Sequence, residues 1–463
     1  MNNLPDINFD NVNKVHFIGI GGISMSGLAE ILLSKGYSVS GSDTTPSELT
    51  KRLENSGAII SYVQEASNIT DDIDLTVYTA AIRDDDDELM ASKAKGIPTI
   101  PRAELVGLIM KQYRYAIGVS GTHGKTSTTS MISQILLEAN ADPTILVGGM
   151  MSSIGGNLRI GKSDTMITEA CEYTNSFLSF CPTTAVILNV CEDHMDFFKD
   201  LDDIRNSFRR FAALVPADGT VVINKDIENV SYFTEGMDCN VITFSAEDNS
   251  AYVTAKNINY DQMARGSFDL YVGGEYIHSI SLKVTGIHNI YNALAAVAAS
   301  IPMNISMDYI KKGLETFTGT ARRFEYKGEL NGVTIIDDYA HHPDEITTTL
   351  NTAANYPHKK LWCVFQPHTY TRTKAFFNEF VTSLSLADAV VLADIYAARE
   401  VNTIGISSED IHNELQKLGK ESYYFPSFEE IEKFLLKNTQ KGDLLITMGA
   451  GNVVNIGEDL LKG

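Results

Sequence analysis

The segment Tyr115-Ala-Ile-Gly-Val-Ser-Gly-Thr-His-Gly-Lys-Thr126 joins a short apolar run to a glycine-rich turn that ends in a Lys-Thr pair. The apolar run predicts a strand over residues 115–120, and residues 127–137 predict a helix after the turn. Backbone N–H groups in such a turn bind the oxygens of a nucleoside triphosphate, while the lysine adds positive charge and the Thr126 hydroxyl helps to hold Mg²⁺. The segment therefore predicts a phosphate-binding loop for ATP.

The glycine spacing of this loop departs from the strict G-x-x-x-x-G-K-[ST] pattern. Val119 occupies the first glycine position, and Gly118 and Gly121 lie on either side of it. The strand before the loop and the helix after it make a purely structural turn the less favoured alternative. We interpret His123 as a loop residue and not as a catalyst. The residues expected to bind ATP here are Gly121, Thr122, His123, Gly124, Lys125, Thr126 and Ser127.

Two further series of alternating strands and helices flank this loop. Before it, a strand (14–20), a turn with Gly19, Gly21 and Gly22, a helix (25–34) and two strands (37–41 and 75–80) are expected. The strands expected after the loop are 165–169, 185–190, 220–224 and 240–244, then an antiparallel patch near 252–282. The strands expected after residue 320 are 333–338, 361–366, 389–394 and 444–448. This alternation predicts parallel, doubly wound sheets with ligands at the carboxyl ends of their strands.

Length and composition set the broad class. The 463 residues correspond to about three domains at roughly 150 residues each. We expect an α/β protein with domains at 1–112, 113–319 and 320–463. The five cysteines are odd in number and form no C-x-x-C pair, so neither a disulfide framework nor a structural zinc site is indicated.

The charge of the chain argues against two classes of partner. The net charge is −22, from 59 acidic and 37 basic residues. The sequence contains no cluster of Lys and Arg residues that could bind the phosphate backbone of a nucleic acid or the surface of an anionic membrane. Because no signal region and no run of about 18 apolar residues occurs, we expect a cytoplasmic enzyme without membrane insertion.

Acidic residues follow two of the strands expected in the central region. Glu169 closes the strand 165–169, Glu172 comes three residues later, and the acidic segment 192–196 around His194 follows the strand 185–190. Mg²⁺ prefers oxygen ligands and keeps several waters, so one or two side chains beside Thr126 suffice. From spacing alone, it is equally plausible that these carboxylates and His194 are ordinary loop residues and that they bind Mg²⁺.

The first glycine turn matches a dinucleotide-binding fingerprint in part. Ser24 occupies the third glycine position of G-x-G-x-x-G, and Asp43 follows the turn by about twenty residues. An acid there would accept a hydrogen bond from a ribose hydroxyl, and a role in a turn or helix cap is the alternative. A nicotinamide-dependent oxidoreductase is disfavoured, because it would leave the Gly-Lys-Thr loop without a role.

Nine segments of the chain together resemble one family, the Mur ligases, and most closely its alanine-adding branch. They run in the family's order from residue 17 to residue 452. The segments are 17–27, 121–126, 169–173 with 176–178, 193–196, 286–292, 322–325, 337–343, 365–368 with 371–373, and 449–452.

The resemblance implies a Rossmann-like N-terminal domain for a UDP-sugar, a central ATPase domain with a mostly parallel sheet, and a Rossmann-like C-terminal domain that closes over the site. It implies that ATP phosphorylates the lactyl carboxylate of UDP-N-acetylmuramate and that the amine of L-alanine displaces phosphate, in peptidoglycan precursor synthesis. The enzyme would be a monomer or a homodimer. A recycling ligase that joins a tripeptide to the same sugar is the main alternative, and a non-catalytic UDP-sugar sensor is disfavoured because Lys125, Glu169 and His194 are intact.

The resemblance also implies residue roles. Lys125 contacts the terminal phosphates, and Thr126, Glu169 and His194 organise Mg²⁺. His288 and Asn292 hold the adenine. The residues implied in UDP-sugar binding are Gly19, Gly21, Gly22, Ser24, Asp43 and His368. The C-terminal residues implied in nucleotide or substrate contacts are Arg323, Asp338, His342, His368 and Arg372. The residues implied in catalysis are Lys125, Glu169, His194, His342 and Arg372, and either histidine could accept the proton of the attacking amine.

Overall fold

A computed structural model describes residues 7, 9–79, 82–195, 197–398 and 400–462. The chain divides into two compact units. The first unit is formed by Met1–Thr254, Tyr271–Tyr276 and Asn292–Gly313, and the second by Ala255–Leu270, Ile277–Tyr291 and Leu314–Gly463. The domain boundaries expected from the sequence stay a prediction.

The first unit begins with a five-stranded sheet whose pairings are all parallel. Its order is β3-β2-β1-β4-β5. The strands are β1 (Lys14–Ile18), β2 (Ser38–Ser42), β3 (Ile59–Ser61), β4 (Leu75–Tyr78) and β5 (Thr99–Pro101). The helices that follow them are α1 (Ile23–Ser34), α2 (Glu48–Asn55), α3 (Asp87–Ala94) and α4 (Arg102–Met110). The order reverses beside β1, which places the ligand crevice of this Rossmann-like sheet at the ends of β1 and β4.

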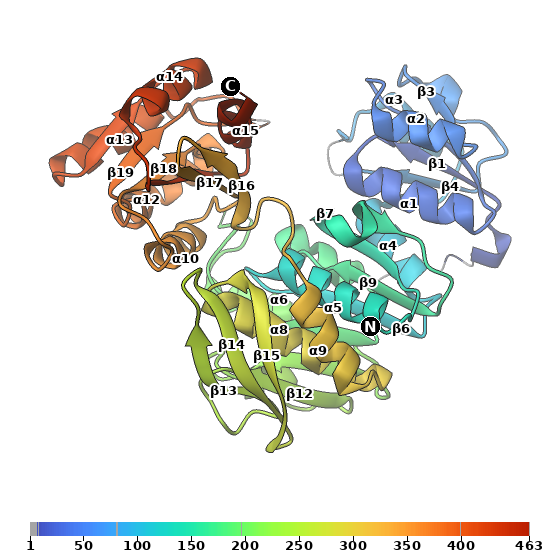
Figure 1. Cartoon of the computed structure of the whole chain (residues 1–463). Coiled ribbons are helices and arrows are strands. Elements are labelled where there is room, and N and C mark those ends of the chain that lie inside the picture. Colours follow the sequence, from blue (N-terminus) through green and yellow to red (C-terminus); the bar gives the residue numbers. More distant parts are fainter. Residues whose placement is uncertain (1–6, 8, 80–81, 196, 399, 463) are drawn as a thin grey trace. The chain divides into compact units, whose positions relative to one another are not determined.

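The first unit continues with a second, mostly parallel sheet in the order β12-β11-β10-β6-β9-β7-β8, in which β8 is antiparallel to β7. Its strands are β6 (Tyr115–Ser120), β7 (Thr144–Met151), β8 (Gly156–Arg159), β9 (Thr165–Glu169), β10 (Thr184–Ile187), β11 (Thr220–Asn224) and β12 (Asn240–Ser245). Its helices are α5 (Lys125–Glu138), η4 (Tyr173–Ser179), α6 (Leu201–Ala212), α7 (Ser231–Thr234) and α9 (Met307–Thr316). In Figure 1, α5 runs alongside β6 and β9, with which it is in contact.

One apolar core joins these two parts of the first unit. It extends from Val15 and Leu28 in the N-terminal part to Phe177 and Phe208 in the central part. Gly107 of α4 approaches η4 so closely that a Cβ there would lie 1.9 Å from the carbonyl oxygen of Ser179. The N-terminal part is therefore fixed against the central part within this unit.

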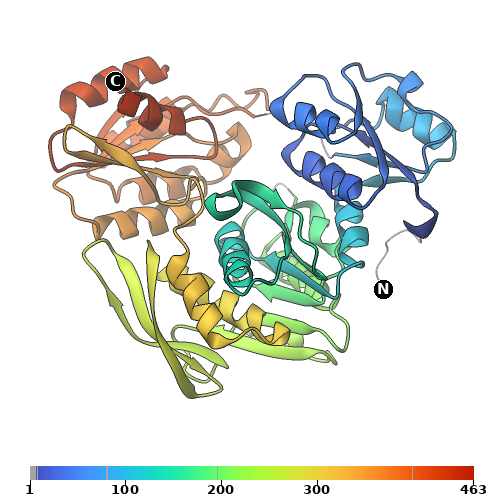
Figure 2. The same ribbon diagram turned by 45° about the vertical axis from the view of Figure 1, so that its right-hand side comes forward.

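The second unit contains a six-stranded sheet in the order β16-β17-β21-β18-β19-β20, antiparallel only at β16. The strands are β16 (Glu325–Leu330), β17 (Val333–Asp338), β18 (Leu361–Phe365), β19 (Ala389–Leu392), β20 (Glu421–Tyr424) and β21 (Leu444–Met448). The helices are α10 (Pro343–Ala354), α11 (Tyr370–Ala375), α12 (Phe377–Leu384), α13 (Ser408–Lys417), α14 (Phe428–Asn438) and α15 (Val454–Lys462). Two separate apolar clusters cover the two faces of this sheet, which lies between its helices (Figure 1 and Figure 2).

The antiparallel patch expected near 252–282 is confirmed by β13 (Val253–Tyr260), β14 (Arg265–Val272) and β15 (Glu275–Thr285), which follow one another through short turns. The first residues of β13 pair with β12. Helix α8 (Ile287–Ser300) follows β15. The α/β class with mostly parallel sheets is therefore confirmed. No helix among the described residues combines the length and apolar composition needed to cross a membrane.

Some predicted bounds were wrong by a few residues. The strand expected at 185–190 ends at Ile187, because Asn189 bonds to the phosphate loop instead of continuing the ladder. The strand expected at 75–80 ends at Tyr78, and residue 80 lies outside the described residues. The short strands β3, β5, β16 and β20 were not predicted at all.

Candidate functional site

The predicted phosphate loop connects β6 to α5. Gly121 and Gly124 have positive φ angles of 145° and 87°. A Cβ on Gly124 would lie 2.6 Å from Asn292 Oδ1, and one on Gly121 would lie 2.8 Å from Leu188 Cβ. Only glycine fits at these two positions. The first N–H groups of α5 therefore follow a turn without side-chain bulk, which is the geometry that binds phosphate oxygens.

Lys125 lies folded back over this loop. Its Nζ donates to the carbonyl oxygens of Gly121 (2.5 Å) and Thr122 (3.1 Å) and to both carboxylate oxygens of Glu172 (3.0 and 3.1 Å). Burial lowers the pKa of Lys125, but the charge of Glu172, the hydrogen bond to it, and the charges of Cys171 and Glu169 together outweigh burial, so the pKa lies above its usual value. The lysine is thus charged and next to the loop, where an anion would bind.

Asn189, which follows the end of β10, holds the loop through two hydrogen bonds. Its Oδ1 accepts from the backbone N–H of His123 (2.8 Å), and its Nδ2 donates to the His123 carbonyl oxygen (3.0 Å). Thr122 is bonded to the backbone of Cys191 in the same reciprocal manner, with its hydroxyl accepting at 3.0 Å and donating at 3.3 Å. His123 is therefore held through its backbone.

Two side chains with oxygen donors meet at the start of α5. The Thr126 hydroxyl donates to Glu169 Oε2 (3.0 Å), while Glu169 Oε1 accepts from the backbone N–H of Gly148 on β7 (2.5 Å). The register that pairs Glu169 with Val119 places this carboxylate beside the end of β6. A hydroxyl and a carboxylate at this separation form the oxygen donor set that Mg²⁺ prefers.

His194 lies at the edge of the same group. Its Nε2 is 4.0 Å from Glu172 Oε1 and 3.7 Å from Asp193 Oδ2, and its ring lies 4.4 Å from that of Tyr173. Its backbone has φ = 54°, which is uncommon for a residue other than glycine. Asp196, in the same segment, lies outside the described residues. The structure thus brings His194 close to Glu172, which is the partner of Lys125.

The two residues implied in adenine binding have different surroundings. Asn292 is buried, and its Oδ1 accepts from the Thr128 hydroxyl (3.2 Å) on the first turns of α5. His288 lies half-buried at the start of α8, where its Nε2 is 3.1 Å from the Asn289 amide. Burial and the charge of Arg323 lower the pKa of His288 to about 4. A neutral imidazole can stack on or hydrogen-bond an adenine ring.

The glycine turn after β1 is organised by Asp43. Its Oδ2 accepts from the Gly21 N–H (2.8 Å), its Oδ1 accepts from the Thr44 N–H (2.8 Å), and a Cβ on Gly21 would lie 2.8 Å from Oδ2. Both carboxylate oxygens therefore accept hydrogen bonds from backbone N–H groups. This favours a role for Asp43 in the turn over the role of a ribose acceptor. Gly19 has φ = +82°, and Ser24 lies in the first turn of α1.

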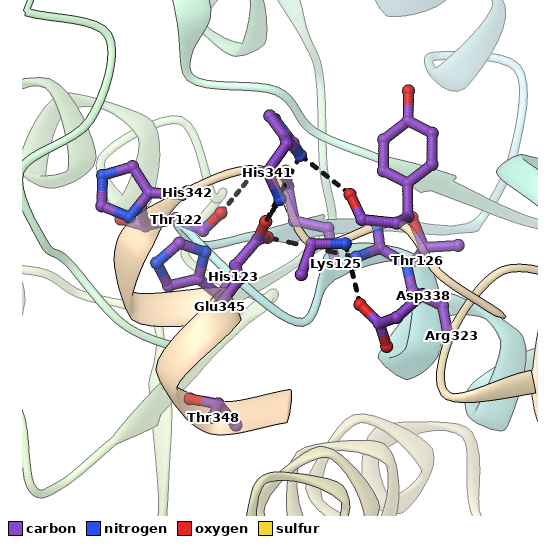
Figure 3. Close-up of polar contacts among 12 residues, drawn as sticks. Thr122, His123, Lys125, Thr126, Arg323, Asp338, His341, His342, Glu345 and Thr348 are labelled. Carbon is purple, nitrogen blue, oxygen red and sulfur yellow. Dashed lines mark hydrogen bonds and ion pairs between the residues drawn. The ribbon is translucent and has the colours of Figure 1, made fainter. Parts of the chain in front are cut away.

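The residues implied in the second unit gather at the carboxyl ends of its strands. Asp338 closes β17 and accepts N–H bonds from Ala340 (2.7 Å) and Phe324 (2.8 Å). Burial, opposed by the charge of Arg323, raises the pKa of Asp338 to about 6. Arg323 lies 4.0 Å from Glu345, which also bonds to the backbone N–H of His341 (3.1 Å), as Figure 3 shows.

Three further predicted residues lie near this cluster. His342 caps α10 by accepting the Asp344 N–H at its Nδ1 (3.3 Å). His368 is half-buried, and its ring lies 5.7 Å from that of Tyr396. Burial lowers the pKa of His368, and the charge of Arg372 on α11 lowers it further. His341, which also faces the charge of Arg372 and whose pKa burial lowers to about 4, was not among the residues predicted from the sequence.

Family descriptions match three successive parts of the chain. "Mur ligase family, catalytic domain" matches residues 14–114, "Mur ligase middle domain" matches 119–300, and "Mur ligase, glutamate ligase domain" matches 322–451. The chain belongs to the Mur ligase family. Figure 3 thus shows polar side chains from the middle and glutamate ligase parts of a Mur ligase.

Individual relatives agree with this assignment. The UDP-N-acetylmuramate–L-alanine ligase of Lachnospira eligens is 59% identical over 98% of this chain and 99% of its own length. That of Clostridium novyi is 51% identical over 98% of both chains. The crystal structure of UDP-N-acetylmuramate-alanine ligase from Thermotoga maritima is 29% identical and matches 97% of this chain and 98% of its own with a TM-score of 0.79. The murein peptide ligase of Psychrobacter arcticus shares the fold, with a TM-score of 0.70 at 24% identity.

Two polar residues that organise the phosphate loop of this Mur ligase were not identified from the sequence. Glu172 was noted only as a carboxylate beyond a strand, and Asn189 was placed inside a strand. Their contacts with Lys125 and His123 join residues 47 and 66 positions apart. Spacing along the chain carries no signal for such pairs, and only the order of the strands brings them together.

Proposed function

We propose that this Mur ligase joins L-alanine to the lactyl carboxylate of UDP-N-acetylmuramate and converts ATP to ADP and phosphate. The observation that carries this proposal is the loop from Gly121 to Thr126, in which Lys125 is paired with Glu172 and Thr126 is bonded to Glu169. The high identity to relatives named for the same reaction supports alanine as the amine.

The chemistry explains why these groups are needed. A carboxylate is a poor acyl donor, and transfer of the terminal phosphoryl group of ATP creates an acyl phosphate whose leaving group is phosphate. The loop N–H groups and Lys125 bind the phosphates and offset their charge. Thr126, Glu169 and His194 would hold Mg²⁺, which neutralises charge on the transferring group when bound.

The second step requires a proton acceptor for the amine. His194 or His342 would take this proton, and the two remain alternatives. Arg323, Asp338, His368 and Arg372 would contact nucleotide or substrate, and His288 with Asn292 would hold the adenine. Gly19, Gly21, Gly22 and Ser24 would bind the UDP-sugar, with Asp43 shaping the turn. Water must be excluded while the acyl phosphate exists, because it would hydrolyse.

The proposal extends to the domains, the location and the assembly of the enzyme. We propose a UDP-sugar domain at 1–112, an ATP domain at 113–319 and a ligase domain at 320–463. We further propose a cytoplasmic monomer or homodimer that takes part in peptidoglycan precursor synthesis.

The experiment is a phosphate-release assay on the purified chain. With ATP, Mg²⁺, UDP-N-acetylmuramate and L-alanine, phosphate is released, and Lys125→Ala abolishes the release while the exposed Lys111→Ala does not. Phosphate release that ignores the UDP-sugar, or none with any amino acid, would refute the reaction. Faster release with the tripeptide than with L-alanine would favour the recycling ligase. Serine and glycine should be compared too, since a methyl pocket discriminates by only about 1–3 kcal/mol.

A further inference from the structure

Arg102 is a half-buried cation for which the described part of the chain supplies no counter-ion. It begins α4 directly after β5. None of the residues that the structure describes forms a hydrogen bond or an ion pair with its guanidinium. Burial lowers the pKa of Arg102, while the neighbouring Cys171 acts in the opposite sense. A buried guanidinium is costly to leave unpaired, so an anionic ligand would gain much by pairing with it.

Strand register relates Arg102 to the glycine turn of the N-terminal sheet. Ile18, the last residue before that turn, is paired with Tyr78 of β4, and Tyr78 is paired with Pro101 of β5. Arg102 therefore lies at the same carboxyl edge as the turn and two strands away from it. Neighbouring strands are about 4.8 Å apart, which gives a separation of about 10 Å along this edge.

Arg102 also lies near Cys171, which precedes η4 in the central part of the unit. Helix α4 packs on η4, which directly follows Glu172. Cys171 is next to Glu172, and the positive charges of Arg102 and Lys125 both act to lower its pKa. Within the first unit, Arg102 thus lies at the edge of the N-terminal sheet that carries the glycine turn, and it shares the neighbour Cys171 with Lys125.

We propose that Arg102 binds the reacting carboxylate of the UDP-sugar and holds it toward the phosphate loop. This inference rests on the proposed function, in which a diphosphate lies at the glycine turn and a terminal phosphate lies at Lys125. The carboxylate must lie between these two groups, and Arg102 is a cation on that side of the N-terminal sheet to which the described residues supply no ion pair. A planar guanidinium can hold a carboxylate through two parallel N–H bonds, which fixes its orientation for phosphoryl transfer.

The carboxylate fits Arg102 better than the diphosphate does. The diphosphate has the N–H groups of the glycine turn and the start of α1 as its site, and Arg102 is two strands away from that turn. A sugar ring with its ether substituent spans a distance of the same order as this separation. Arg102 therefore binds the lactyl carboxylate, which is the group that distinguishes an acidic sugar from a neutral one.

The test compares two ligands and three variants in the full chain without ATP. The ligands are UDP-N-acetylmuramate and UDP-N-acetylglucosamine, which lacks the lactyl group, and binding is measured by calorimetry. Arg102→Met keeps most of the side-chain stem, Arg102→Lys keeps the charge without the fork, and Arg83→Gln removes an exposed arginine of the same part as the control.

Arg102→Met should weaken UDP-N-acetylmuramate binding about 10- to 100-fold, leave UDP-N-acetylglucosamine binding unchanged, and raise the KM for the UDP-sugar but not for ATP. Arg102→Lys should be intermediate. Because Arg102 forms no hydrogen bond or ion pair with the described residues, the ligand-free Tm of Arg102→Met should not fall below that of the unmodified chain.

Two results would overturn the inference. Equal weakening of both ligands would assign Arg102 to the diphosphate, and a lowered Tm with unchanged binding would make it structural. Failure of the proposed function is separable, because the unmodified chain itself would then not prefer UDP-N-acetylmuramate and would release no phosphate.

Discussion

Replacing Asp338 with asparagine should change how the stability of the second unit depends on pH. Asp338 is buried, and its pKa is raised from 3.8 to about 6. Between these two values the folded chain keeps a proton that the unfolded chain has lost. The stabilisation from the protonated form is therefore fully present below pH 3.8 and is lost as the pH rises through about 6.

The magnitude follows from the size of this pKa change. Each pKa unit corresponds to about 1.36 kcal/mol, so a change from 3.8 to about 6 makes the ionised Asp338 cost about 3 kcal/mol of unfolding free energy. Asparagine removes the charge, but its Nδ2 is a donor and cannot accept a hydrogen bond. The N–H of either Phe324 or Ala340 would therefore lose its acceptor. That lost hydrogen bond costs about 1–3 kcal/mol at every pH. Asp338→Asn should thus be the less stable protein near pH 4 and should approach the unmodified chain at pH 7.

Trp362 offers a specific probe for this experiment. It is the only tryptophan of the sequence, and it is buried in β18 of the sheet that contains Asp338. Urea unfolding followed by its fluorescence between pH 4 and 7.5 reports the second unit. Asp459→Asn, which changes an exposed carboxylate on α15, is the matched control. The same pH slope in Asp338→Asn and in the unmodified chain would refute the reasoning.

Three other predictions concern the first unit. Gly124→Ala should raise the KM for ATP about tenfold or more, because φ is +87° and the new Cβ would lie 2.6 Å from Asn292 Oδ1; an unchanged KM would contradict the fit of the loop. Gly107→Ala should destabilise the chain by about 1–3 kcal/mol and lower the Tm, because the Cβ would lie 1.9 Å from the Ser179 carbonyl oxygen; phosphate release per folded molecule should be kept at low temperature. Glu169→Gln should raise the Mg²⁺ concentration needed for half-maximal phosphate release about tenfold or more, because a neutral amide replaces the carboxylate beside Thr126; an unshifted Mg²⁺ titration would remove Glu169 from the proposed ligands.

The sequence predicted those parts of the fold that depend on local pattern. The strands at 115–120, 165–169, 220–224, 333–338 and 444–448 have the predicted bounds, because each is a buried apolar run between polar turns. The strands β3, β5 and β20 have only three or four residues, and β16 alternates polar residues at a sheet edge. Pairing with a neighbour defines such strands, and their own sequence does not.

The hydrogen-bond partners of side chains were harder to predict from the sequence than the strands were. The Asp43 carboxylate follows its glycine turn at the distance expected for a ribose acceptor, yet both of its oxygens hold backbone N–H groups. The close approach at Gly21 makes this possible, because a Cβ there would meet Oδ2 at 2.8 Å. A sequence pattern fixes which residue types are present at a turn, and the strand positions decide which groups they bind.

The irregular glycine spacing of the phosphate loop has a structural reason. β6 continues to Ser120, so Val119 is a strand residue, fully buried and paired with Val186 on one side and Glu169 on the other. A strand position needs no glycine, and the turn begins only at Gly121. The pairing of Val119 with Glu169 also brings the Glu169 carboxylate to the end of β6, where it lies 3.0 Å from the Thr126 hydroxyl. The departure from the usual pattern therefore belongs to the same register that places a carboxylate beside the phosphate loop.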